Sequence, residues 1–147
     1  MSTSLVRAAC AALFGMLAAC TTLQDKTVHN STLYERLGGS AQIAAIVSDT
    51  IDRTAQDERT RRHFDGINML RTKTSVATHL CSVTGGNCKY EGDDMTTAHA
   101  GMDISALEFD IMDGYLAQAL DRHGVDAATK HELERLLAPM KAQIVGK

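Results

Sequence analysis

Apolar residues recur at helical spacing along most of the chain after residue 32. The pattern predicts a short helix over residues 33–37 and longer ones over residues 40–55, 68–83, 105–123 and 126–144. No segment sustains the apolar–polar alternation of a half-buried strand. We therefore expect an all-α fold.

Residues that cap or interrupt helices mark the boundaries of these segments. Ser40, Asn68, Ser105 and Asp126 stand where helices are expected to begin, and each can accept a hydrogen bond from a free backbone N–H. Glycine tolerates the left-handed C-terminal cap, so Gly85 and Gly124 are expected to end helices. Pro139 should kink the last helix. Residues 85–98 are rich in Gly and Asp and predict a loop, with at most a short helix near residues 95–100.

Composition limits the classes of protein to consider. The chain has 147 residues, of which 44% are hydrophobic, and a formal net charge of −3. This length suits one domain plus a targeting segment. Acidic and basic residues are mixed, with no basic stripe, so a nucleic-acid partner is not expected.

The N-terminus predicts export. Arg7 precedes an apolar run over residues 8–19, which is too short for an ordinary transmembrane helix. The run ends in Leu17-Ala18-Ala19-Cys20, which resembles a bacterial lipobox. We therefore expect residues 1–19 to be a lipoprotein signal peptide, Cys20 to carry the lipid, and residues 20–31 to be a polar tether. The alternative is an ordinary secretory peptide with a chance cysteine. Since Thr21 follows Cys20, the expected location is a periplasm-facing lipoprotein of the bacterial outer membrane.

Two cysteines, Cys81 and Cys88, remain in the expected mature domain. An exported protein lies in an oxidising compartment, which favours a disulfide between them. Seven residues of continuous helix would hold their Cα atoms about 10 Å apart, too far for a bridge. A disulfide therefore requires the helix to stop near Thr84. Free thiols or a metal-binding pair are the alternatives.

Short motifs in a fixed order resemble the group 1 truncated haemoglobins. The resemblance covers residues 32–145 and rests on Leu33-Tyr34-Glu35-Arg36-Leu37-Gly38-Gly39, Phe64-Asp65-Gly66, Tyr90-x-Gly92-x-x-Met95, Ala98-His99-Ala100-Gly101-Met102 and Leu137-Ala138-Pro139-Met140. It implies that residues 32–147 form a two-over-two helical sandwich around haem b.

The same resemblance assigns roles to individual residues. His99 takes the position of the proximal iron ligand, and Phe64 that of the aromatic packed on the haem face. Met95 and Met102 flank His99 and are expected to contact the haem. No Cys-x-x-Cys-His motif is present, so covalent c-type attachment is not expected.

The distal side departs from the family. Ile51 stands where many members have a Tyr, and Thr72, Ser75 and Val76 stand where Gln or His is common. Thr72 and Ser75 are expected to be weak donors at most. We therefore expect dioxygen to be held less firmly than in typical members. His79 follows on the same helical face, where the family usually places a large apolar residue. It is expected to bind iron as a sixth ligand, to line an access route, or to be a half-exposed residue beside Cys81.

The resemblance implies a haem protein that binds dioxygen, nitric oxide or carbon monoxide. An enzymatic version would oxidise nitric oxide to nitrate with bound dioxygen and an external reductase or other electron donor. The alternative is a six-coordinate haem protein for electron transfer or for redox or gas sensing. A third class is a haem-free interaction lipoprotein that keeps the fold alone.

Overall fold

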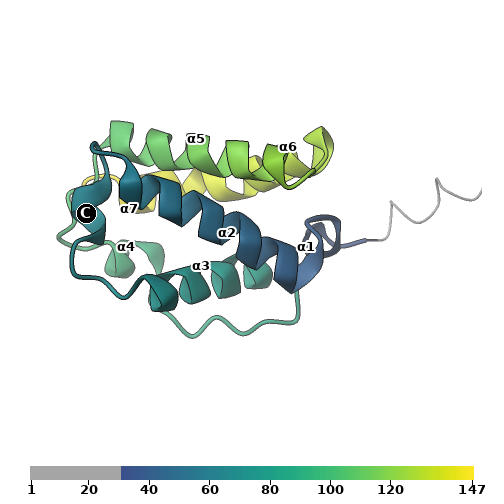
Figure 1. Ribbon diagram of the computed structural model, residues 1–147. Coiled ribbons are helices and arrows are strands. Elements are labelled where there is room, and N and C mark those ends of the chain that lie inside the picture. Colours follow the sequence, from purple (N-terminus) through teal and green to yellow (C-terminus); the bar gives the residue numbers. More distant parts are fainter. Residues whose placement is uncertain (1–30) are drawn as a thin grey trace, which may run out of the picture. The chain divides into compact units, whose positions relative to one another are not determined.

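The computed structural model describes residues 31–147 (Figure 1). The predicted signal peptide, the lipidation of Cys20 and nearly all of the predicted tether lie outside the described residues. Ser31–Lys147 form one compact unit. None of the helices within this unit has the length and apolar character needed to cross a membrane.

The described residues form helices and no strands, which confirms the all-α prediction. The helices follow the expected segments closely, with short 3₁₀ helices before α3 and after α6. In chain order they are α1 (Leu33–Arg36), α2 (Gly39–Gln56), η2 (Arg61–Phe64), α3 (Met69–Val83), α4 (Met95–Ala98), α5 (Ala106–Arg122), α6 (Ala127–Leu137), η3 (Ala138–Met140) and α7 (Lys141–Ile144).

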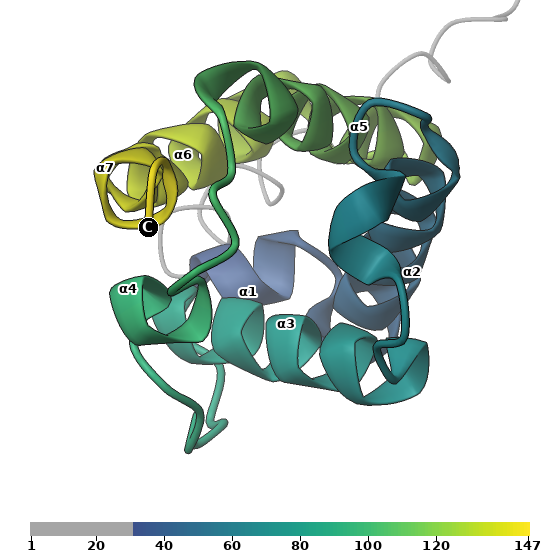
Figure 2. The ribbon, with the colours of Figure 1, turned by 90° about the vertical axis from the view of Figure 1, so that its left-hand side faces the viewer.

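Helix α2 is the centre of the packing. It packs along both α3 and α5, and in Figure 1 α3 lies below α2 while α5 lies above it. Viewed from the end, α2, α3, α4, α7 and α5 follow one another around the molecule (Figure 2). The buried apolar core includes Ile43, Ile46 and Val47 of α2, Leu120 of α5 and Leu133 of α6.

Three of the four predicted N-caps are confirmed. The side chains of Asn68, Ser105 and Asp126 each accept a hydrogen bond from a backbone N–H in the first turn of α3, α5 and α6. The prediction for Ser40 was wrong, because α2 already begins at Gly39. Gly38 takes the capping position with a φ of 85°, a left-handed conformation that favours glycine.

Pro139 interrupts the last helical segment as predicted. It lies in η3, where the chain tightens into a 3₁₀ turn between α6 and α7. Proline has no N–H for the helical ladder, so the regular α-helical bonding cannot pass through this position. The turn leaves Leu137, Met140 and Ile144 along one wall of a large cavity.

Candidate functional site

A cavity of about 510 Å³ lies inside the arrangement of helices seen in Figure 2. Its walls come from α2, η2, α3, α4, α5 and the α6–α7 segment, so no single element builds it. Most lining side chains are apolar, and they include Phe64, Leu116 and Ile144. A space of this size and character is typical of a site for a small organic molecule or cofactor.

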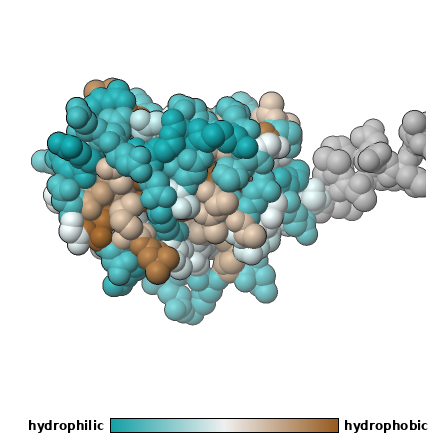
Figure 3. All heavy atoms as spheres, viewed as in Figure 1, coloured by the Kyte–Doolittle hydropathy of each residue, from teal (hydrophilic) through white to brown (hydrophobic). Residues whose placement is uncertain are grey.

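Apolar surface reaches the outside beside this cavity. Ile67 lines the cavity and is 39% exposed, and Leu70 at the start of α3 is 76% exposed. In Figure 3 hydrophobic atoms show between the hydrophilic ones on the face formed by α2 and α3. The cavity is therefore not sealed by a polar surface on this side.

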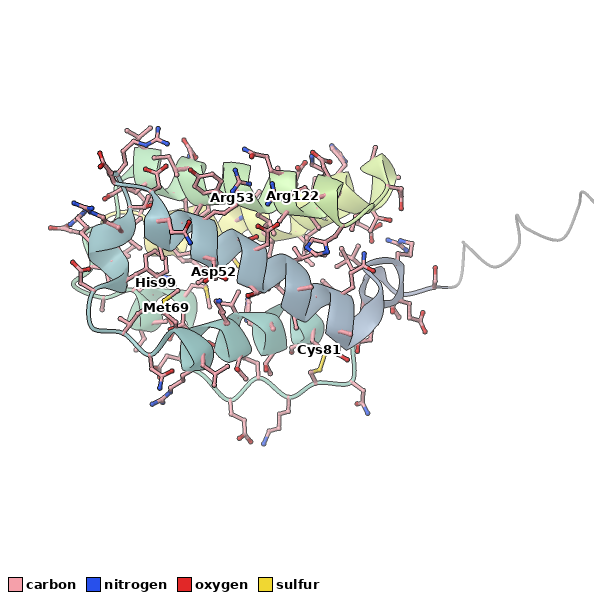
Figure 4. All side chains as sticks on the ribbon, viewed as in Figure 1. Asp52, Arg53, Met69, Cys81, His99 and Arg122 are labelled. Atoms are coloured by element: carbon pink, nitrogen blue, oxygen red, sulfur yellow. A yellow bond between two sulfur atoms is a disulfide. The ribbon has the colours of Figure 1, made fainter. Side chains whose placement is uncertain are left out.

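His99 lies directly after α4 and lines the cavity. Its ring Nδ1 donates a hydrogen bond to the backbone oxygen of Met95 over 2.7 Å. A carbonyl oxygen can only accept, so the proton of a neutral imidazole is on Nδ1 and the lone pair is on Nε2. Figure 4 shows His99 at the same end of the molecule as Met69, the first residue of α3.

The wall of α2 and α3 that lines the cavity is mainly apolar at its centre. Ile51 is almost completely buried, and Val76 packs against the core. Thr72 lines the cavity too, but its hydroxyl donates to the backbone oxygen of Asn68 over 3.2 Å. The hydroxyl of Thr50 likewise donates to the backbone oxygen of Ile46. These threonines therefore have their donors engaged within their own helices.

His79 and Ser75 are also polar residues of α3 that line the cavity at this wall. The Nε2 of His79 is a buried atom without a hydrogen-bond partner. Burial lowers the pKa of His79 below its usual value, which favours the neutral ring. The edge of the Tyr90 ring packs on the imidazole with the centroids 4.9 Å apart. One side of His79 is therefore covered by Tyr90, which also lines the cavity.

A disulfide joins Cys81 to Cys88 with the Cα atoms 5.8 Å apart. Helix α3 ends at Val83 and Gly85 follows with a φ of 87°, so the chain turns back as the spacing requires. Cys81 lies two residues after His79, and Cys88 lies two residues before Tyr90. The disulfide and the ring contact therefore connect the same two segments.

The residues predicted to surround a haem all line this one cavity. They are Ile51, Phe64, Thr72, Val76, His79, Met95, His99 and Met102. They come from segments that are far apart in the sequence, and the fold brings them together.

Comparison with known proteins identifies the family. The model of the bacterial-like globins matches residues 32–145. This chain belongs to the bacterial-like globin family. The group 1 truncated haemoglobin of Tetrahymena pyriformis is 31% identical over 116 residues, which are 79% of this chain and 96% of that protein. That of Mycolicibacterium paratuberculosis is 31% identical over 114 residues, covering 78% and 84%.

Solved truncated haemoglobins share the fold of this globin. The Fe(III) form of the Tetrahymena pyriformis protein matches with a TM-score of 0.76 and 31% identity, covering 80% of this chain and all of that chain. The 2/2 haemoglobin of Synechococcus sp. PCC 7002 is 22% identical, covers 78% of this chain and 98% of that one, and matches in fold with a TM-score of 0.73. The predicted two-over-two truncated haemoglobin fold is confirmed.

The globin domain contains a charged cluster that the sequence analysis missed. The carboxylate of Glu108 lines the cavity and accepts two hydrogen bonds from the Arg62 guanidinium, over 2.8 and 3.0 Å. His63 Nε2 lies 3.0 Å from the same carboxylate. The Arg62 side chain, followed by the N–H and hydroxyl of Ser105, holds the pKa of Glu108 far below its usual range. The spacing Ser105-x-x-Glu108 was the available signal, because it is a capping box.

Tyr90 is the second residue whose contribution to the site was missed. It was noted only as part of a motif, and its contact with His79 depends on how the loop after Cys88 folds back. The signal was the symmetric placement of His79 and Tyr90 around the two cysteines.

Proposed function

We propose that this globin binds one haem b in the cavity and uses it to bind diatomic gases. The observation that carries the proposal is the imidazole of His99, which lines an apolar cavity with its Nδ1 proton fixed by Met95. This tautomer leaves Nε2 as the free metal-binding nitrogen, and imidazole is a common haem ligand. Haem supplies an iron centre that binds dioxygen, nitric oxide or carbon monoxide.

The other lining residues fit the cofactor by shape and polarity. Phe64 would pack on the macrocycle, while Met95 and Met102 lie near His99 in sequence and can fill irregular space around it. Ile51 and Val76 would keep the distal side apolar and exclude water from the position of the gas. The exposed apolar residues beside the cavity are consistent with an opening to solvent.

The nature of the gas and of any reaction is a further part of the proposal. Oxidation of nitric oxide by dioxygen consumes one of each and one electron to give nitrate. The electron must come from a separate donor, because the chain carries no flavin or nicotinamide motif. Reversible gas binding needs no such donor.

The test is the visible spectrum of the purified protein in its ferric, ferrous and CO-bound forms. We expect one haem per chain, uptake of carbon monoxide by the ferrous protein, and loss of haem or of the normal spectrum in His99→Ala. His131→Ala is the matched control, because His131 is exposed and lies outside the cavity lining. If the wild-type protein takes up no haem, the haem proposal is wrong and the alternative of a haem-free interaction lipoprotein is supported.

One observation favours a second candidate, a six-coordinate haem protein for electron transfer or sensing. His79 lines the cavity in addition to His99, and its ring would have to turn from the position in which Nε2 is buried to offer the iron a second imidazole. Its position is unfavourable, because seven helical residues separate it from Thr72 by about 10 Å along α3. Sharp six-coordinate ferrous bands that disappear in His79→Ala would support this candidate.

The export of the globin is a separate proposal. We infer from Leu17-Ala18-Ala19-Cys20 that residues 1–19 are removed and that lipid on Cys20 anchors the domain in the outer membrane, facing the periplasm. Acyl chains hold a protein in a membrane because each buried CH₂ contributes about 0.8 kcal/mol. Cys20→Ser should move the protein from the membrane fraction to the soluble fraction. If the variant stays in the membrane fraction, the anchor is not at Cys20.

A further inference from the structure

The segment that carries His99 has little apolar anchoring. From residue 85 to residue 107 no side chain is buried, although the flanking Thr84 and Glu108 are buried. The disulfide at Cys88 ties down only the first part of this segment. Segments with few buried apolar contacts are the ones that open most readily in a folded protein. Hydrogen bonds to other parts of the chain are therefore important for holding His99 in place.

Hydrogen bonds connect residues 89–104 to the rest of the described chain at only two positions, Asp103 and Ile104. The N–H of Asp103 donates to the backbone oxygen of Lys147 over 2.9 Å. The N–H of Gly146 donates to the backbone oxygen of Ile104 over 2.9 Å. We call these two bonds the latch. The latch joins the loop that follows α4 to the residues that follow α7, which itself packs on α4 (Figure 2).

The backbone at the latch is held in an unusual conformation. Asp103 has a φ of 52° and is the one non-glycine residue among residues 31–147 with a positive φ. A residue with a Cβ disfavours this left-handed conformation, so it persists only where the surroundings impose it. A third bond contributes, because the Arg62 guanidinium donates to the backbone oxygen of Asp103 over 3.1 Å. Strained backbone that several bonds hold in place is typical of positions where geometry matters for function.

The latch is connected to His99 by one short turn of the chain. The N–H of Met102 donates to the backbone oxygen of His99 over 3.1 Å. Met102 and Ile104 line the cavity on either side of Asp103 in the sequence. A displacement of Asp103 would therefore move the cavity wall and the backbone of His99 together.

We propose that the latch is a positioning element for His99, which sets the orientation of the imidazole toward the haem iron and slows the loss of haem. The proposal rests on the proposed haem function. Gly146 and Lys147 lie outside the cavity lining, so they act through the backbone of the loop and not by touching the cofactor. Without the latch the imidazole would take several orientations, because the loop behind it would be free to move.

The experiment compares substitutions at Gly146 that differ in their effect on the latch. Gly146 has a φ of 69°, and an added Cβ would meet no atom within 4 Å, so a side chain has room there. Gly146→Pro removes the N–H and forces φ to about −65°, which breaks the latch. The preceding Val145 is already extended, with φ −66° and ψ 126°, as a residue before proline requires, so α7 is not disturbed.

Two further substitutions at the same position keep the N–H. Gly146→Asn is the matched control, because Asn tolerates the left-handed conformation better than other residues with a Cβ. Gly146→Ala lacks this tolerance, so it strains the latch without removing its donor. The three variants therefore form a graded series at one exposed position.

Three quantities measure the effect of the latch. They are the rate of haem transfer from the ferric protein to an excess of an apo-globin, the Fe–His stretching band of the ferrous protein, and the exchange rate of the Asp103 amide in the apo-protein. In Gly146→Pro we expect haem to leave about five times faster, because one hydrogen bond is lost. The Fe–His band should shift and broaden, and the Asp103 amide should exchange faster. Gly146→Asn should match wild type in all three, and Gly146→Ala should lie between them.

Two results would overturn the inference while leaving haem binding intact. One is a Gly146→Pro variant whose haem transfer and Fe–His band equal those of Gly146→Asn. The other is faster haem loss with an unchanged Fe–His band, because the latch would then stabilise the fold without positioning His99. Failure of wild type to take up haem would instead overturn the proposed function on which the inference rests.

Discussion

At the scale of single residues, the charge of Glu108 is held by Arg62, which lies 46 residues away in the sequence, and by Ser105, which lies three residues away. Its side chain is 10% exposed and receives hydrogen bonds from Arg62 and Ser105. Charge-assisted hydrogen bonds of this kind contribute about 1.5–3 kcal/mol. We expect Glu108→Gln to lower the free energy of unfolding at pH 7 by about this amount. Urea unfolding measures it, and the exposed Glu58→Gln is the control.

The lowered pKa of Glu108 also predicts how its contribution to stability changes with pH. Its pKa is lowered in the folded protein, so its contribution is fully present above the unfolded pKa of Glu, about 4.3, and is lost as the pH falls towards the lowered value. The difference in unfolding free energy between wild type and Glu108→Gln should therefore shrink below about pH 4. A difference that stays constant with pH would show that the Glu108 charge is not what stabilises this corner.

The same residues show where sequence reasoning stops. His99 and Phe64 were found because each stands within a short local motif. The Arg62–Glu108 pair was not found, because the two residues are 46 positions apart in the sequence. They meet only because η2 lies against the start of α5 in the folded protein. The pair formed by His79 and Tyr90 depends in the same way on a loop whose path no periodicity describes.

At the scale of elements, the helices were predictable because capping residues and apolar spacing agree along the chain. The exception at the start of α2 has a local cause. Ser40 has the right chemistry for a cap, but Gly38 takes the left-handed conformation first, so the helix begins before the serine. Short elements such as η2 and α4 have too few residues to show a helical period of apolar positions. Only their capping or turn residues can predict them from the sequence.

The disulfide is the element-scale feature with the clearest test. It closes a loop of eight residues between the end of α3 and the segment that carries Tyr90. Loss of such a constraint from the unfolded chain is worth about 2–3 kcal/mol in the chain-entropy model. We expect the double variant Cys81→Ser, Cys88→Ser to have a free energy of unfolding lower by this amount and therefore to unfold at a lower urea concentration.

Reduction gives an independent check of that prediction. Dithiothreitol should lower the urea midpoint of wild type to that of the double variant and leave the double variant itself unchanged. A wild-type midpoint that does not respond to reduction would count against the disulfide.

At the scale of the whole molecule, the cavity divides the fold into parts with different dependence on the cofactor. Helix α2 packs directly along α3 and α5, so much of its contact area is independent of what fills the cavity. Helix α4 is a single turn that packs on α7 and is held by the Asp94 cap, and it carries His99 at its end. A ligand that binds only the folded state stabilises most strongly the parts that it contacts.

We therefore expect removal of haem to loosen the molecule unevenly, as measured by amide hydrogen exchange. The amides of α4 should exchange at least about ten times faster in the apo-protein, because a link through His99 would be lost, while those in the middle of α2 should change much less. His99→Ala supplied with haem should resemble the apo-protein in α4, and His131→Ala should resemble wild type. Equal acceleration in α2 and α4 would mean that the cofactor stabilises the fold as one unit, and that α2 does not form an independent frame for the site.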